Sequence, residues 1–142
     1  MIYKKNKLKI DGFNINYLAK KYKTPIYCYS LKKIKDNIES LKRNFKKINP
    51  LICYAVKANT NLSILKEIKN YNLGADVVSI GELKKALKAG ISPKKIVFSG
   101  VGKTFEEIEY AVSKNILLIN AESKSEILVI EKIARKKKKI VK

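Results

Sequence analysis

Short apolar runs alternate along the chain with longer segments in which apolar residues recur every three or four positions. Apolar runs of this length are typical of strands, and the periodic segments are typical of amphipathic helices. The predicted strands lie at residues 26–29, 51–56, 75–78, 96–99 and 116–119. Strands that are apolar throughout are usually buried on both faces, so the alternation predicts parallel βα units.

The first two predicted helices follow the strands at 26–29 and 51–56. Ser30 is a candidate N-cap for the first helix. That helix presents one apolar face, which is formed by Leu31, Ile34, Ile38, Leu41 and Phe45. In the second helix, the residues predicted to point inward are Leu62, Leu65, Ile68 and Tyr71. Both patterns fit helices that pack one stripe against a core.

Three later helices begin with a capping-box pattern, in which Ser or Thr is followed three residues later by Glu. The pairs are Ser79–Glu82, Thr104–Glu107 and Ser123–Glu126. The first of these helices is predicted to run through Ala89, with Gly90 at its end, where glycine accepts a left-handed backbone.

The spacing of the units bears on which α/β architecture they build. From Ile52 onward a unit takes about 20 to 25 residues, a common spacing in (β/α) barrels. The chain holds four such units and the start of a fifth at Ile140–Val141. An open doubly wound sheet of five strands is the alternative that periodicity leaves open. The strand that begins at Ile140 favours an interrupted barrel. We therefore predict an α/β fold that forms roughly the first half of a (β/α)8 TIM-type barrel.

The formal charge of +20 raises the question of nucleic-acid binding. Of the 32 basic residues, 30 are lysine, and only Arg43 and Arg135 are arginine. The chain also has 20 Ile and 12 Asn, an excess that AT-rich codons would produce. Nucleic-acid sites favour arginine for bidentate contacts, and here the lysines are spread over the whole chain. We therefore expect a solvated lysine-rich surface and no nucleic-acid partner.

Neither a membrane segment nor a metal site is expected. No stretch approaches the roughly 18 apolar residues of a membrane span, and the N-terminus lacks the apolar core of a secretory signal. These features predict a cytoplasmic protein without membrane association. Cys28 and Cys53 form no C-x-x-C pair, and the chain has no histidine, which excludes a Cys/His zinc site. Both thiols are expected to be buried and reduced.

Lys57 is the candidate nucleophile. The chemistry of α/β folds lies at the carboxyl ends of the strands, and Lys57 directly follows the run at 51–56. A lysine at that position is expected to be partly desolvated, which favours the neutral amine needed for Schiff-base chemistry. Asp76 with Ser79, and the loop 99–103, occupy two other strand ends. With 30 lysines in the chain, position alone does not single out Lys57.

The loop Gly100-Val101-Gly102-Lys103-Thr104 ends like a nucleotide-binding P-loop. The P-loop pattern G-x-x-x-x-G-K-[ST] needs glycine at position 97, where this chain has Val97. A turn between a strand and a helix, with Thr104 as N-cap, accounts for the loop. Nucleotide hydrolysis is therefore not expected.

Four segments together resemble one enzyme family. They are TPIYCYS at 24–30, YAVKANTN at 54–61, ADVVSIGEL at 75–83 and KIVFSGVGKT at 95–104. The segment at 54–61 is similar to the cofactor-lysine motif of the ornithine and diaminopimelate decarboxylases, and its Ala58-Asn59 pair resembles the diaminopimelate branch. The segments occur in the order and spacing of that family, and the resemblance covers nearly the whole chain.

The resemblance implies a (β/α) barrel in which Lys57 binds pyridoxal 5'-phosphate covalently. The cofactor acts as an electron sink after the substrate carboxylate leaves as CO2, and the reaction implied is the conversion of meso-diaminopimelate to L-lysine. Asp76 matches an aspartate near the cofactor lysine, although a role in capping a turn stays equally open for it. Glu82 matches an acidic position near the family's active site, but its place in the capping box explains it without a function.

The resemblance also implies parts that the chain lacks. The family uses a histidine stacked on the cofactor, a glycine-rich phosphate loop, an acidic partner for the pyridine nitrogen, and residues from a C-terminal β-domain and a second subunit. We therefore expect residues 1–142 to be an N-terminal part of the barrel domain, with 1–30 as a candidate contribution to the β-domain. Such a chain would be inactive alone, whether it is a fragment of a longer sequence, the product of a broken gene or one piece of a split enzyme. The full-length family forms homodimers.

Three alternatives remain at this stage. Another pyridoxal-phosphate enzyme of the same fold, such as an ornithine or arginine decarboxylase or an alanine racemase, would share the quoted motifs. A barrel fragment could also serve as a cofactor carrier without catalysis. A basic nucleic-acid-binding protein is the third, and a steep salt dependence of binding would distinguish it.

Overall fold

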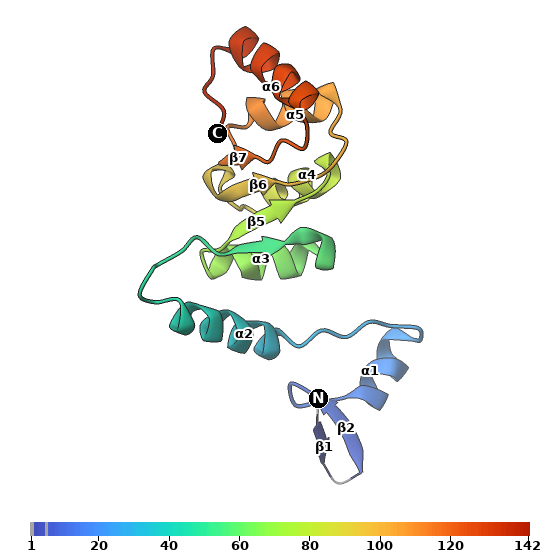
Figure 1. The fold of residues 1–142 in the computed structure, drawn as a ribbon. Coiled ribbons are helices and arrows are strands. Elements are labelled where there is room, and N and C mark those ends of the chain that lie inside the picture. The colour runs from blue at the N-terminus through green and yellow to red at the C-terminus, as the bar shows by residue number, and fades with distance from the viewer. Residues whose placement is uncertain (1, 5) are drawn as a thin grey trace. The chain divides into compact units, whose positions relative to one another are not determined.

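The computed structural model describes residues 2–4 and 6–142, which form two compact units (Figure 1). One unit extends up to Asn49, and the other comprises Pro50–Lys142. Each unit has its own sheet, and the strands of one sheet do not pair with those of the other within the described residues. The assignment of residues 1–142 to a single barrel domain stays a prediction.

The N-terminal unit contains a small antiparallel sheet that the apolar pattern did not predict. Its strands are β1 (Ile2–Lys4), β2 (Lys7–Ile10) and β3 (Phe13–Asn14), in the order β1-β2-β3. Asp11 and Gly12 link the last two strands with φ angles of 47° and 89°. Asp-Gly pairs favour such left-handed hairpin turns, so this dipeptide was the available signal. Helix α1 (Ile15–Tyr22) follows, and the Asn14 side chain caps it.

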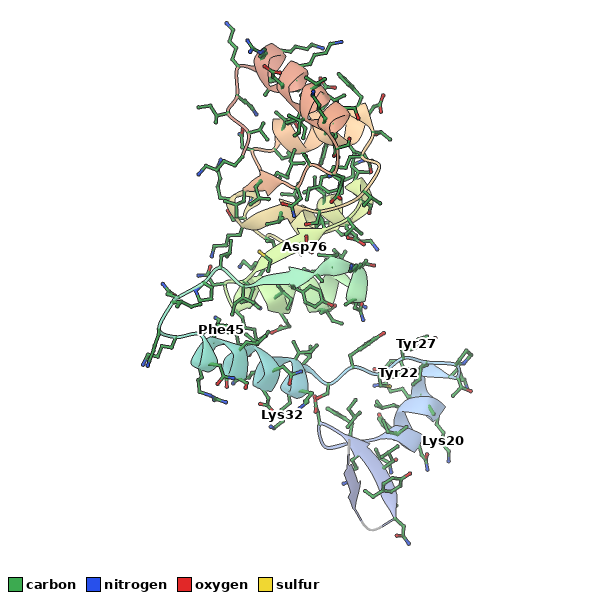
Figure 2. The ribbon with its side chains drawn as sticks, viewed as in Figure 1. Lys20, Tyr22, Tyr27, Lys32, Phe45 and Asp76 are labelled. Atoms are coloured by element: carbon green, nitrogen blue, oxygen red, sulfur yellow. The ribbon has the colours of Figure 1, made fainter. Side chains whose placement is uncertain are left out.

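Helix α2 (Leu31–Asn44) confirms the helix predicted after Ser30. The Ser30 hydroxyl accepts a hydrogen bond from the Lys33 N–H at 3.0 Å and donates one to Asp11 Oδ1 at 2.6 Å. Of the predicted apolar face, Ile38 is buried, whereas Leu31, Leu41 and Phe45 are exposed; Figure 2 labels Phe45.

The strand predicted at 26–29 is wrong, because these residues belong to no strand. Backbone groups form a strand only when a partner segment pairs with them, and none of the described residues does so. Tyr27 is 88% exposed. The segment instead lines a hollow of about 530 Å³ together with Phe13, Leu18 and Tyr22, and Figure 2 labels Tyr22 and Tyr27.

The second unit confirms the four predicted βα units. Its strands are β4 (Cys53–Ala55), β5 (Gly74–Val77), β6 (Ile96–Phe98) and β7 (Leu118–Ile119). Its α-helices are α3 (Leu62–Asn70), α4 (Ile80–Lys88), α5 (Phe105–Ser113) and α6 (Lys124–Lys137). Two 3₁₀ turns, η1 (Val56–Ala58) and η2 (Pro93–Lys95), complete it. All neighbouring strands are parallel.

The order of these elements corresponds to part of a barrel. The strands lie in the order β4-β5-β6-β7, without the reversal that marks a doubly wound sheet. Helices α3, α4, α5 and α6 each contact the next, so they form one layer (Figure 1). The sheet face with Ala75, Val77, Ile96 and Phe98 is buried. The chain therefore forms a partial (β/α) barrel, as the sequence predicted.

The predicted helix starts are confirmed, with one difference in the capping boxes. Ser79, Thr104 and Ser123 each accept a hydrogen bond from the N–H of the glutamate three residues later. Only in α5 does that glutamate bond to its own N-cap residue: Glu107 Oε2 accepts a hydrogen bond of 3.0 Å from the Thr104 N–H. Glu82 and Glu126 reach one residue further back, to the N–H of Val78 and Glu122, at 2.8 and 2.9 Å.

Two smaller expectations have different outcomes. The strand expected to begin at Ile140–Val141 is wrong, because these residues belong to no strand, although the Ile119 N–H in β7 donates to the Lys142 carbonyl at 2.9 Å. The expectation of buried thiols is wrong for Cys28, which is exposed because the segment around it packs in no sheet; Cys53 is half-buried, and both thiols are free.

Among residues 2–4 and 6–142, no helix is long and apolar enough to cross a membrane.

Candidate active site at the carboxyl edge of the parallel sheet

Lys57 lies at the carboxyl end of β4, where the chain leaves the sheet. Strand β4 ends at Ala55, and residues 56–58 form the turn η1, whose first residue, Val56, is fully buried. Lys57 itself is exposed. The expected partial desolvation is therefore wrong for this chain, because the turn anchors Val56 in the core and carries Lys57 past the end of the sheet.

Asp76 lies on the neighbouring strand, close to the same edge. It pairs in register with Ala55, two residues before Lys57. Its half-buried side chain lies on the sheet face opposite to the buried residues Ala75 and Val77. Figure 2 labels Asp76 in the second unit. The Asp76 carboxylate Oδ1 accepts a hydrogen bond of 2.6 Å from the Ser99 hydroxyl. Asp76 is therefore tied to the next strand of the sheet.

Ser99 and Asn120 extend this contact across the sheet, and their roles were missed at the level of sequence. Each directly follows a strand, β6 and β7 respectively. The Asn120 side chain donates from Nδ2 to the Ser99 hydroxyl at 2.9 Å. The available signal was that polar residues occupy the same position after two adjacent apolar runs, which places both at one edge of a parallel sheet.

Lys103, in the loop 99–103 after β6, has a structural role. Its ammonium group donates to Glu126 Oε1 at 2.7 Å and to the Asn120 carbonyl at 2.7 Å. The Lys103 side chain is only 1% exposed, and it lies 5.6 Å from the centre of the Phe98 ring. A lysine held in this way is not available to bind phosphate, which supports the rejection of a P-loop.

The half-buried Cys53 is a poor candidate for the nucleophile. Its thiol packs over Gly74, where a Cβ atom would come within 2.7 Å of the sulfur. Burial, and secondarily the negative charge of Asp76, raise the pKa of the Cys53 thiol above its usual value of 9.0. A raised pKa disfavours the thiolate, which is the reactive form, so Cys53 is a poorer nucleophile than an ordinary cysteine. Lys57 is an exposed amine at the carboxyl edge, with the carboxylate of Asp76 on the adjacent strand.

Comparison with known protein families shows which family this chain resembles. The model of the pyridoxal binding domain of pyridoxal-dependent decarboxylases matches residues 31–142, most of the chain. The chain belongs to this family. The resemblance predicted from the motifs at 54–61, 75–83 and 95–104 is thereby confirmed. The family is one of carboxy-lyases that depend on pyridoxal phosphate, as predicted.

Curated relatives of the chain carry the name diaminopimelate decarboxylase. The enzyme of Helicobacter pylori strain J99 is 55% identical over 123 residues, which is 87% of this chain and 30% of the relative. The crystal structure of the H. pylori enzyme complexed with L-lysine matches with a TM-score of 0.84 and 51% identity, over 88% of this chain and 32% of that one. The crystal structure of diaminopimelate decarboxylase from m. jannaschi matches with a TM-score of 0.94 and 36% identity, over 99% of this chain and 34% of that one.

The chain of this decarboxylase family member is short relative to these proteins. It spans about 30% of the length of the curated relative from H. pylori. The barrel architecture and the dependence of the family on pyridoxal phosphate are therefore established for the matched part. The reaction, the substrate and the assembly are those of whole enzymes about three times as long as this chain. For this chain they are proposals.

Proposed function

We propose that the chain forms part of a diaminopimelate decarboxylase, which converts meso-diaminopimelate to L-lysine and CO2, and that Lys57 is its cofactor lysine. One observation carries the proposal. Lys57 is an exposed amine at the carboxyl end of β4, and the carboxylate of Asp76 lies on the next strand, in register with Ala55, two residues before Lys57. The proposal assigns the chain a part in that reaction, and not turnover by the 142 residues alone.

The residues at this edge fit pyridoxal phosphate. Among the described residues, the Lys57 ammonium has no hydrogen-bond or ion-pair partner, so its amine can condense with an aldehyde. Asp76 is fixed by Ser99 at 2.6 Å and places negative charge on the adjacent strand. When bound, the cofactor supplies an electron sink for the bond that loses CO2. Lys57 would hold it, and Asp76 would orient it and balance its positive charge.

The names of the relatives support the proposed substrate. The similar proteins carry the name diaminopimelate decarboxylase, and one of their structures holds L-lysine. We extend that substrate class to the protein of which this chain is part. Homodimer formation and a cytoplasmic location are further parts of the proposal, taken from the resemblance.

The assay for Lys57 depends on selectivity, because the chain has 30 lysines. Condensation of a lysine amine with the aldehyde of pyridoxal phosphate releases water, and borohydride reduces the product to a stable secondary amine. A cofactor that binds at the sheet edge is held beside Lys57, which raises its effective concentration there. Lys66, exposed on α3, reacts only with cofactor from solution and serves as the internal reference.

The measurement is peptide mass spectrometry of the 142-residue chain after brief exposure to pyridoxal phosphate and reduction. We expect Lys57 to be modified faster than Lys66. Lys57→Arg should abolish the preferred modification without creating a new preferred site, whereas Lys66→Arg should leave labelling of Lys57 unchanged. Equal labelling of Lys57 and Lys66 in the unaltered chain would overturn the assignment of Lys57.

A further inference from the structure

Three polar side chains at the carboxyl edge form a single chain of hydrogen bonds across three strands. Asn120 Nδ2 donates to Ser99 Oγ at 2.9 Å, and Ser99 Oγ donates to Asp76 Oδ1 at 2.6 Å. The three residues follow or belong to β7, β6 and β5. The hydroxyl of Ser99 therefore lies between the amide and the carboxylate.

The chemistry of these groups fixes which group donates and which accepts in each of the two hydrogen bonds. A carboxylate accepts hydrogen bonds and donates none, whereas a serine hydroxyl has a single proton to donate. Because Asp76 takes that proton, the oxygen of Ser99 must accept from its other neighbour. Asn120 can satisfy this only by presenting its NH2 group, which is the arrangement observed. Asn120 thus holds the hydroxyl of Ser99 turned toward Asp76.

Both donors are anchored by the main chain. The Ser99 N–H donates to the Val77 carbonyl at 2.8 Å, and the Asn120 N–H donates to the Phe98 carbonyl at 3.0 Å. The Asn120 carbonyl accepts from the buried Lys103 ammonium at 2.7 Å. The two main-chain bonds continue the parallel ladder beyond the ends of the strands. The backbone of Ser99 and of Asn120 is therefore held in register at the edge of the sheet.

We infer that Ser99, held by Asn120, is a positioning residue for Asp76 and, through Asp76, for the reaction of Lys57 with its cofactor. The inference rests on the proposed function, in which Asp76 orients the bound cofactor. Ser99 engages one carboxylate oxygen, Oδ1, and leaves Oδ2 for the cofactor or for Lys57. Without the hydroxyl, the carboxylate would rotate and lose the orientation in which it holds the cofactor beside Lys57.

The test compares labelling of Lys57 relative to Lys66 in four variants of the chain. Ser99→Ala should lower this ratio by about tenfold, the lower end of what a hydrogen bond to a charged group contributes. Ser99→Thr keeps the hydroxyl and should restore the ratio. Asn120→Ala keeps Ser99 but frees its hydroxyl, and should lower the ratio by a smaller factor. Ser113→Ala removes an exposed hydroxyl on α5 and should change nothing.

The outcomes separate the two proposals. If the unaltered chain labels Lys57 and Lys66 equally, the proposed function fails, and the role of Ser99 fails with it. If the unaltered chain prefers Lys57 and Ser99→Ala keeps that preference, only the inference about Ser99 is overturned. A ratio for Ser99→Thr as low as that for Ser99→Ala would also overturn it, because the hydroxyl would then not be the group that matters. Thermal unfolding of each variant confirms that the labelled chain is folded.

Discussion

The Lys103 ammonium and the Glu126 carboxylate form a buried ion pair, with 2.7 Å between Nζ and Oε1 and with side chains only 1% and 9% exposed. The pair joins the loop after β6 to the first turn of α6. Each partner makes a second hydrogen bond: Lys103 also donates to the Asn120 carbonyl, and Glu126 also accepts from the Glu122 N–H. The ion pair therefore holds the loop 99–103 against the first turn of α6.

Removal of one partner of this pair should destabilise the chain strongly. Lys103→Met leaves the Glu126 carboxylate buried without its cation, at an expected cost of about 3–5 kcal/mol in the free energy of unfolding. Urea denaturation at neutral pH measures it. The double variant Lys103→Met with Glu126→Gln should be more stable than Lys103→Met, because a neutral amide tolerates burial and still accepts from the main chain.

The matched control is an exposed ion pair of equal length. Arg135 and Glu131 lie 2.7 Å apart on the surface of α6. Glu131→Gln should cost at most about 0.5 kcal/mol, as is usual for exposed pairs on a helix. A loss from Lys103→Met as small as this one would show that the buried pair does not stabilise the fold.

The stability of the chain should fall in acid through Glu126. Burial alone would raise the pKa of Glu126, but hydrogen bonds from Lys103 and from the Glu122 N–H, together with the charge of Lys103, hold it below the usual 4.5. A carboxyl whose pKa is lower in the folded state stabilises the fold fully above its unfolded pKa. That contribution is lost as the pH falls through the folded pKa.

The pH dependence is measured by urea denaturation between about pH 6 and pH 3. We expect the free energy of unfolding to decrease from about pH 4.5 downward, and Glu126→Gln to show a shallower decrease over that range. Identical slopes for the two proteins would contradict the coupling of Glu126 to folding.

Gly100 should not accept a side chain. A Cβ atom at this position would overlap the Val78 carbonyl oxygen and lie 2.8 Å from the Val78 carbonyl carbon. Both are backbone atoms, so relief requires β5 and β6 to separate at their carboxyl edge. Gly100→Ala should therefore lower the free energy of unfolding by about 1–3 kcal/mol or more, as measured by thermal or urea denaturation.

Gly81 provides the matched control for this substitution. It lies in α4, and an added Cβ would meet only the Ser79 hydroxyl, at 3.8 Å. Gly81→Ala should leave stability unchanged or raise it by up to about 1 kcal/mol, since alanine favours helix. Equal losses at Gly81 and Gly100 would mean that the close approach of the strands at Gly100 is unimportant.

Local signals in the sequence predicted much of the second unit. The apolar runs predicted strands β4 to β7, and Ser79, Thr104 and Ser123 predicted the starts of three helices. Such signals act over a few residues, because a cap bonds to an N–H three positions away and a strand needs an apolar run. Ser99 and Asn120, in contrast, are 21 residues apart, and only the register between β6 and β7 brings their side chains together.

By itself, the sequence determined the βα repeat, the helix caps and the family, because each depends on the residue types within a short segment. Only the tertiary structure decided that residues 26–29 form no strand, because pairing requires a partner segment. Tertiary structure also decided that Lys57 is exposed, that Ser99 links Asp76 to Asn120, and that Lys103 pairs with Glu126. Exposure and contacts between distant residues follow from how strands and helices pack, which no local pattern in the chain records.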